Sequence, residues 1–221
     1  MIRISETTRN QRVYHAILSH LLTGEIPAGT QLDERTLADQ HNVSRTPVRE
    51  AIIRLVREGL IEYYPYRGHF VKTWTVKQVQ DLFEVRKALE ALAIRIAVRK
   101  ISDEDIDEIS AILNDVDQAI KDNDLKTYGE ADKRFHQTII NKTDNQTLID
   151  ALNQLTAQIQ LIRSIANRDP GLVERTLAER PRILQALRTR DADMSALMMV
   201  EHIQGVEDAV IAQMKALEQE N

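Results

Sequence analysis

Arg45, Thr46 and Arg49 form the first group of side chains in this sequence whose types and spacing suit a defined chemistry. They stand near the start of a stretch with helical apolar spacing, and they face away from its apolar side. The planar guanidinium of an arginine can bind O6 and N7 of one guanine together, and a threonine hydroxyl can donate to a phosphate. The N-terminus of a helix also attracts phosphate. This arrangement is typical of a helix that enters the DNA major groove.

Two short helices joined by a tight turn are predicted to position these residues. The first helix, whose apolar face begins at Leu37, is expected to end at His41, where polar residues with turn tendencies interrupt the pattern. Ser44 is expected to cap the second helix, and Pro47 is tolerated in its first turn because the N–H it lacks would have no intrahelical acceptor. Gly59 ends the second helix. Its apolar stripe consists of Val48, Ala51, Ile52, Leu55 and Val56.

A β-hairpin is predicted directly after these helices. Residues 60–64 and 69–73 form β-prone runs on either side of Pro65-Tyr66-Arg67-Gly68, a turn whose tip carries a cation and a flexible glycine. A helical hairpin with a charged, solvated face would explain the two helices alone. The added hairpin favours a winged helix-turn-helix that binds DNA.

The string VSRTPVREAIIRLVREGLI, followed by YRGHFV, resembles the winged helix-turn-helix of the GntR family of bacterial transcription regulators. The resemblance implies DNA contacts from an arginine at the start of the first motif helix, from the N-terminal residues of the recognition helix and from the wing tip. The residues at and beside these positions are Arg35, Ser44, Arg45, Thr46, Arg49, Arg67, Gly68 and His69.

Length and composition restrict the class of protein. With 221 residues, 43% of them hydrophobic, the chain can form two modest domains with their own cores. No apolar run approaches the ~20 residues that cross a membrane, and the first residues lack the apolar stretch of a secretory signal. We therefore expect a cytoplasmic protein. Because the sequence has no cysteine, disulfides and thiolate metal sites are excluded.

The net charge of −5 at first argues against a nucleic-acid ligand, but the charge is unevenly distributed. Residues 1–74 hold ten Lys and Arg against eight Asp and Glu, whereas residues 75–221 hold nineteen against twenty-six. A DNA-binding domain needs only a local basic face to neutralise phosphates. Since one copy would bind weakly, we expect a homodimer in which the second copy doubles the contacts.

Beyond Trp74 the sequence is almost continuous helix, because only three glycines and two prolines interrupt it. The expected fold is mainly α, with a winged helix-turn-helix and its small β-hairpin in residues 1–74 and an all-α six-helix bundle in residues 75–221. Helices are predicted over residues 76–99, 103–121, 124–141, 145–167, 172–188 and 191–219.

A second chemical group lies in the predicted bundle. Asp132 and His136 are four residues apart and therefore share one helix face, and His202 stands on the last helix. A carboxylate and two imidazoles can hold a divalent metal. The spacing alone is weak evidence, because most helical proteins contain an Asp and a His at this separation in a purely structural role.

The blocks FEVRKALEALAIRIA, ADKRFHQTI, AERPRILQALRTRDAD and MMVEHI resemble the all-helical effector domain, FCD, of the FadR branch of GntR regulators, and six helices are closest to the VanR-like subgroup. The resemblance implies an effector-binding and dimerisation domain in which one Asp and three His hold a metal such as Zn, Ni or Mn, with a small organic acid bound over it. The matching positions are Asp132, His136, Arg180 and His202, so an arginine replaces the third histidine.

The replacement by Arg180 leaves two interpretations open, because a guanidinium cannot ligate a metal. In the first, its fixed charge takes the place of the metal, pairing with Asp132 or binding an effector carboxylate through a bidentate fork. In the second, Asp132, His136 and His202 still hold a metal with an open coordination position. We favour the interpretation in which Arg180 takes the place of the metal. A buried cation beside a dication costs ~3–5 kcal/mol unless an anion separates them.

Two further arginines are candidates for the effector cavity. Arg86 matches the FCD arginine that reaches the cavity from the first bundle helix; its alternative role is a surface ion pair with Glu90, four residues on. Arg163 interrupts an otherwise apolar helix, and its alternative role is a surface arginine whose stem covers apolar residues.

These observations predict a transcription regulator, a repressor in the commoner outcome for the family, that binds a palindromic double-stranded operator as a homodimer and responds to a small organic acid. The expected hinge is residues 73–78. Two alternatives are a metal-dependent helical enzyme, which would use Asp132, His136 and His202, and a protein-binding adaptor. We expect no enzyme, because no nucleophile motif or glycine-rich phosphate loop is present.

Overall fold

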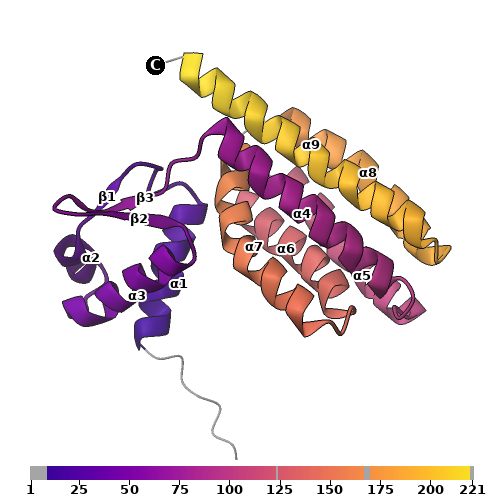
Figure 1. The fold of residues 1–221 in the computed structure, drawn as a ribbon, viewed down its shortest axis with the longest axis horizontal. Coiled ribbons are helices and arrows are strands. Elements are labelled where there is room, and N and C mark those ends of the chain that lie inside the picture. Colours follow the sequence, from indigo (N-terminus) through magenta and orange to yellow (C-terminus); the bar gives the residue numbers. More distant parts are fainter. Residues whose placement is uncertain (1–8, 123, 167–169, 220–221) are drawn as a thin grey trace, which may run out of the picture. The chain divides into compact units, whose positions relative to one another are not determined.

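The computed structural model describes residues 9–122, 124–166 and 170–219 (Figure 1). The chain divides into two compact units, Met1–Trp74 and Thr75–Asn221, called here the N-terminal and C-terminal units. The fold is mainly α with one small antiparallel sheet, as the sequence predicts. None of the described helices is long and apolar enough to cross a membrane.

The N-terminal unit contains the predicted helix-turn-helix and wing together with two elements that the sequence analysis missed. The missed elements are the first helix, which packs on the recognition helix, and a two-residue strand that adds a third member to the sheet. The sheet is antiparallel in the order β1-β3-β2. The elements are α1 (Arg9–Leu22), β1 (Gln31–Leu32), α2 (Glu34–Gln40), α3 (Arg45–Arg57), β2 (Ile61–Tyr64) and β3 (Gly68–Val71).

The turn between α2 and α3 sets the position of the recognition helix. Asp33 caps α2 by accepting a hydrogen bond from the Thr36 N–H. Ser44 occupies the cap position of α3, but in the described structure its side chain makes no capping hydrogen bond, so this part of the expectation is wrong. The reason is Pro47, which stands three residues after Ser44 and lacks the N–H that a capping hydroxyl would bind. Pro47 is instead buried with the apolar stripe of α3.

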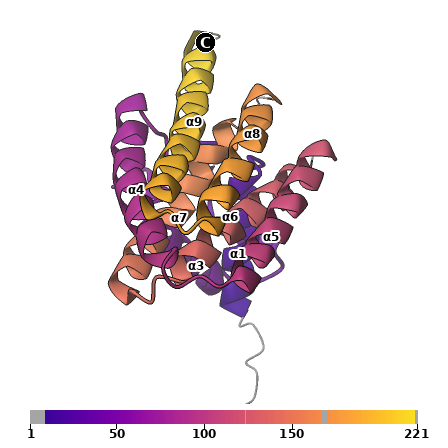
Figure 2. The same ribbon diagram turned by 90° about the vertical axis from the view of Figure 1, so that its right-hand side faces the viewer.

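The C-terminal unit consists, in its described part, of the six predicted helices, each within about two residues of its expected ends. One layer runs in the order α4, α9, α8 and α5, and it covers α6 and α7 (Figure 2). The helices are α4 (Val76–Ala97), α5 (Asp103–Lys121), α6 (Leu125–Asn141), α7 (Gln146–Ala166), α8 (Pro170–Arg188) and α9 (Ala192–Gln219).

The start of α4 shortens the segment in which the expected hinge can lie. Thr75 and Gln78 form a capping box, in which each side chain binds the backbone of the other residue. Residues 76–78, the second half of the predicted hinge, are therefore the first turn of a helix. A hinge between the units, if the prediction holds, therefore lies before Val76.

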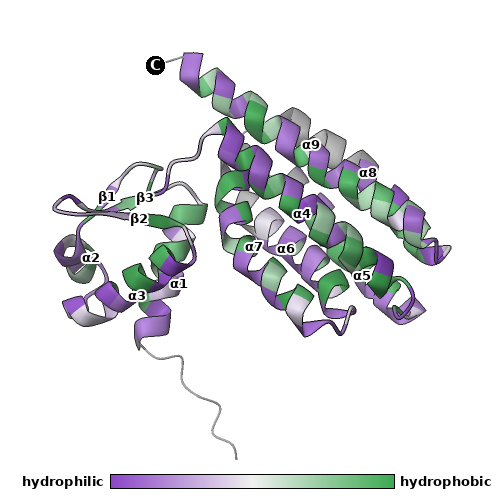
Figure 3. Ribbon diagram, viewed as in Figure 1, coloured by the Kyte–Doolittle hydropathy of each residue, from purple (hydrophilic) through white to green (hydrophobic). Residues whose placement is uncertain are grey.

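The two units differ in what they bury. Hydrophobic and hydrophilic residues alternate along the helices of both units, as expected for helices packed around a core (Figure 3). All the buried polar and charged side chains of the described chain belong to the C-terminal unit. Burying charges is costly unless they are paired, so the buried charged residues of this unit are the place to look for a site.

Candidate functional site

The N-terminal ends of α2 and α3 are joined by an ionic contact. Arg49 donates from Nε and Nη2 to the two carboxylate oxygens of Glu34, at 3.1 and 3.0 Å. Arg45 Nη2 donates to the same carboxylate at 3.2 Å. Hydrogen bonding to Arg49 lowers the pKa of Glu34, although partial burial opposes this. The structure therefore holds Arg45 and Arg49, in the first half of α3, side by side, with more than half of each side chain exposed.

The other predicted contacts on these helices also face solvent. Ser44 and Thr46 are exposed at the start of α3, and Arg35 is exposed on α2 directly after Glu34. The sequence analysis did not predict the contact of Glu34 with Arg45 and Arg49. Its position at the first residue of the helix before the turn was the available signal.

The wing carries its predicted residues on a shaped tip. Gly68 has φ +97° and Tyr66 has φ +63°, backbone conformations that favour glycine and that side chains other than Asn and Asp rarely adopt. Gln31 of β1 donates to the Arg67 carbonyl at 2.6 Å and so connects the wing tip to β1. The Arg67 guanidinium lies over the Phe70 ring, 5.4 Å from its centroid. His69 is half-buried, while Arg67 is exposed.

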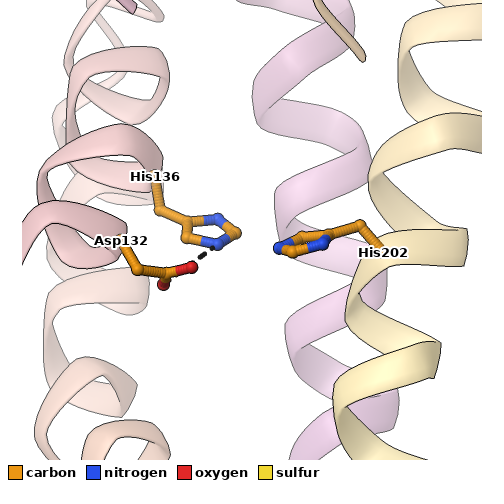
Figure 4. Close-up of side chains that lie close together, drawn as sticks. All are labelled: Asp132, His136 and His202. Atoms are coloured by element: carbon orange, nitrogen blue, oxygen red, sulfur yellow. Dashed lines mark ion pairs between the residues drawn. The ribbon is translucent and has the colours of Figure 1, made fainter. Parts of the chain in front are cut away.

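In the bundle, Asp132 and His136 of α6 point toward His202 of α9 (Figure 4). One ligand atom from each residue lies within 4.8 Å of the other two, and all three side chains are buried. The two imidazole rings are stacked with centroids 5.5 Å apart. The structure thus brings together the predicted aspartate and histidines. We call these three residues and their neighbours the bundle site; its members are Arg86, Glu90, Asp132, His136, Arg163, Arg180 and His202.

Asp132 is surrounded by cations. Arg163 Nη1 donates to Oδ2 in a very short ion pair, and His136 Nε2 lies 3.6 Å from the same oxygen. Arg180 Nη2 lies 3.9 Å from Oδ1, too far for a hydrogen bond. Burial alone would raise the pKa of Asp132, but the charge of Arg163 lowers it, so the carboxylate is ionised.

His136 connects Asp132 to a buried ion pair on α4. Its Nδ1 lies 2.5 Å from Glu90 Oε2, and its Nε2 lies 3.2 Å from Arg86 Nη2. Arg86 Nε donates to the other oxygen of Glu90 at 2.7 Å. Burial works to raise the pKa of Glu90, but its contacts with His136 and Arg86 lower it to about 2. The expected alternative of a surface pair between Arg86 and Glu90 is therefore half right: the pair forms, but it is buried.

His202 is oriented by α8. Its Nδ1 lies 3.2 Å from Glu179 Oε2, and burial lowers the pKa of its imidazole, against the effect of this hydrogen bond. Gly205, one turn further along α9, leaves room for the same carboxylate: a Cβ at Gly205 would lie 3.1 Å from Glu179 Oε1. Glu90 was predicted only as a partner of Arg86 and Glu179 was not predicted, because their contacts with the two histidines depend on which helices pack together.

The remaining arginines of the bundle site are both buried. Besides its pair with Asp132, Arg163 donates to the Tyr128 hydroxyl at 3.0 Å, so the alternative of a surface arginine is wrong. Arg180 is 2% exposed and donates from Nη1 to Asp117 at 3.2 Å. Its Nε and Nη2, together with Arg86 Nη1 and Asp132 Oδ1, are buried without a hydrogen-bond partner among the described residues.

A small open pocket lies between α4, α6 and α7 at this group. Arg86, Asp132 and Arg163 are among the residues that line it, whereas Arg180 and His202 lie outside its lining. Its walls are partly apolar, with Leu152 and Ile159 of α7 on one side. Charged groups in the lining of a partly apolar pocket are suited to hold a small polar molecule in one orientation.

A divalent metal fits only part of this arrangement. Both imidazoles contact a carboxylate through Nδ1, as metal-bound histidines commonly do. However, Asp132 is already bound by Arg163, and Nε2 of His136 faces the guanidinium of Arg86. Arginine cannot give up its charge, so a dication here would be surrounded by fixed cations. The donor set therefore does not fit a resident metal.

Comparison with known proteins gives the same assignment for both units. The family model "Bacterial regulatory proteins, gntR family" matches residues 9–71, and the FCD domain model matches residues 81–205. The chain is 30% identical over 212 residues to the HTH-type transcriptional repressor RspR of Escherichia coli, covering 96% of this chain and 91% of RspR. It is 28% identical to the gluconate operon transcriptional repressor of Bacillus licheniformis, covering 99% and 94%.

Solved structures show the same fold. Escherichia coli McbR/YncC superposes with a TM-score of 0.82 at 22% identity, covering 95% of this chain and all of that one. A GntR regulator of Rhodococcus superposes with a TM-score of 0.79 at 18% identity, covering 92% and 98%.

Proposed function

Because the chain belongs to the GntR family of bacterial transcription regulators and carries an FCD domain, we propose that it is a repressor whose operator binding changes when a small organic acid occupies the helical bundle. Family membership makes it a DNA-binding transcription regulator and not an enzyme. The adaptor alternative is likewise not favoured. A cytoplasmic location follows from this proposal, because bacterial operators lie in the cytoplasm.

The DNA contacts are assigned to α2, α3 and the wing. Arg45 and Arg49 read base edges from the first turns of α3, while the exposed Thr46 binds phosphate. The wing tip contacts the adjacent backbone. The complete assignment is Arg35, Ser44, Arg45, Thr46, Arg49, Arg67, Gly68 and His69. The observation that carries it is the pair of exposed arginines held together at the leading end of α3 by Glu34.

A homodimer on a palindromic operator follows from the weak basic charge of one N-terminal unit. The C-terminal unit supports dimerisation, because large apolar side chains are exposed on two neighbouring helices: Val85 and Leu92 on α4, and Met194 and Leu197 on α9. Exposed apolar side chains on adjacent elements favour a protein interface. Half-sites would lie about one helical turn apart along the duplex, on the same face.

The effector is assigned to the bundle site. The buried arginines Arg86 and Arg163, which line the pocket, suit an anionic ligand, and the name of one relative, the gluconate operon repressor, places sugar acids first among the acids to try. An effector changes operator occupancy only if it binds the DNA-competent and incompetent arrangements with different affinity. A coupling of ~1–3 kcal/mol would change occupancy by ~5–150-fold.

The test begins with selection of random DNA duplexes that the purified protein retains. The proposal predicts a palindromic consensus, bound in gel-shift assays by two chains per duplex. A thermal-shift screen of sugar acids, dicarboxylates and aromatic acids then identifies the effector, because a ligand that binds only the folded state raises the melting temperature. Selection that returns no consensus, or one without two-fold symmetry, would overturn this assignment.

A further inference from the structure

Four buried polar atoms of the bundle site have no hydrogen-bond partner among the described residues. Three are N–H donors, on Arg180 Nε and Nη2 and Arg86 Nη1, and the fourth is the acceptor Asp132 Oδ1. An unsatisfied buried donor on a charged group loses its hydration without compensation, so three such donors together favour the binding of an acceptor. The surplus of donors indicates an acceptor.

The carboxylate of Asp132 cannot supply this acceptor fully. Arg163 occupies its Oδ2, and the gap of 3.9 Å between Oδ1 and Arg180 Nη2 is too long for a hydrogen bond. Arg180 is held in place from its other side by Asp117, which accepts from Nη1. The remaining N–H groups of Arg180 are thus buried and fixed but unused.

His136 is also engaged in a way that opposes a metal. A guanidinium has only donors, so the contact with Arg86 requires His136 Nε2 to accept and leaves the proton of a neutral ring on Nδ1, toward Glu90. The lone pair that would bind a metal is already used. Three guanidiniums, of Arg86, Arg163 and Arg180, supply the positive charge that a dication would bring.

We propose that the bundle site binds a carboxylate ligand directly through arginine N–H groups, with Arg180 as the principal donor, and holds no resident divalent metal. The inference rests on the proposed effector function of this site and departs from the Asp and three-His metal set that the FCD resemblance implies. A planar carboxylate matches the fork of a guanidinium, and the two form parallel hydrogen bonds. Glu90 and Asp132, already paired, keep the arginines oriented without neutralising all of their donors.

Metal content is the first arm of the test. Protein purified without chelators is analysed by plasma emission and then titrated with zinc sulfate in a calorimeter. Less than a tenth of an equivalent of Zn, Ni or Mn per chain, and no stoichiometric zinc binding, are expected. Arg180→His restores the histidine of the family pattern, so that variant should bind zinc at least tenfold more tightly than the wild type. About one metal ion per chain, or equally tight zinc binding by both proteins, would overturn the inference.

Ligand binding without metal is the second arm. The probes are sodium lactate, malonate, citrate and gluconate, with lactamide and malonamide as uncharged controls, in metal-free buffer containing 1,10-phenanthroline. This chelator is neutral and does not compete as an anion. At least one carboxylate should raise the melting temperature, its amide should not, and the chelator should not weaken binding.

Variants identify the donor. Arg180→Gln should weaken the active carboxylate at least tenfold, whereas Arg182→Gln, which removes an exposed arginine two residues away, should change binding less than twofold. Arg180→Lys keeps the charge but loses the fork and should fall between them, which separates ligand contact from a general loss of folding. Binding that needs added metal would sink this inference and leave the effector function standing. The absence of binding by every carboxylate would sink both.

Discussion

Replacing Arg49 by alanine is the substitution with the clearest expected effect on DNA recognition. A bidentate arginine–guanine contact contributes ~1–3 kcal/mol of discrimination, so operator affinity should fall by ~5–150-fold. In the free protein, Arg49 donates through Nε and Nη2 to Glu34. Because the arginine side chain is 59% exposed, solvent weakens this pair, and its loss offsets only a small part of the effect.

Arg57→Ala provides the matched control. It removes the same charge from the last turn of the same helix, where the side chain is also exposed. Affinities are measured by fluorescence anisotropy on the selected operator and on duplexes with each half-site position changed. Arg49→Ala should lose base preference at one position per half-site, while Arg57→Ala should change affinity less than about threefold, as expected for a surface substitution. Equal effects of the two substitutions would show that Arg49 contributes only its charge.

Three further predictions follow from the structure. Glu34→Gln should raise the affinity for non-specific duplex DNA about 2–10-fold, since a carboxylate that repels phosphate is lost. It should also lower the ratio of operator affinity to non-specific affinity. Gel shifts at two salt concentrations measure both affinities, and an unchanged ratio would refute an orienting role of Glu34. Gly129→Ala, with no described atom within 4 Å of the new Cβ, should stabilise the chain by about 0.5–1 kcal/mol in denaturant unfolding, whereas Gly205→Ala should gain less, because its Cβ meets Glu179. Burial, and secondly the charge of His20, lowers the pKa of His41. The unfolded chain therefore takes up a proton that the folded chain does not, and stability is lost as the pH falls below the ordinary value near 6.5. Unfolding followed by Trp74 fluorescence should show this loss between pH 7.5 and 5.5, and His41→Gln should reduce it.

The helices and the wing could be predicted because their signals are local. Long segments with a 3.6-residue apolar period and capping residues at their ends, such as the Ser102 and Asp105 pair that caps α5, determine helices almost independently of the rest of the fold. The first helix was missed although its buried residues Val13, Ile17 and Leu21 keep this period. The strand β1 has only two residues and exists because β3 pairs with it, so no local pattern marks it.

The bundle site could be predicted only in part. Asp132 and His136 share a helix face by spacing alone, but the contacts of Arg163 depend on α6 and α7 packing together. An arginine in an apolar helix is usually a surface residue. The ion pair with Asp132 and the hydrogen bond to Tyr128 offset the cost of burying Arg163. The contacts of Glu90 with His136 and of Glu179 with His202 could not be predicted for the same reason, since each forms between two helices.

The most direct test of the account is titration of the active carboxylate into a mixture of the protein and its selected operator, followed by fluorescence anisotropy. Operator affinity of the wild type should change by ~5–150-fold as the ligand saturates, in metal-free buffer. Arg180→Gln should bind the operator as the wild type does but respond at least tenfold less sensitively to the ligand. A carboxylate that raises the melting temperature yet leaves operator affinity unchanged would contradict the central claim that the bundle site controls DNA binding.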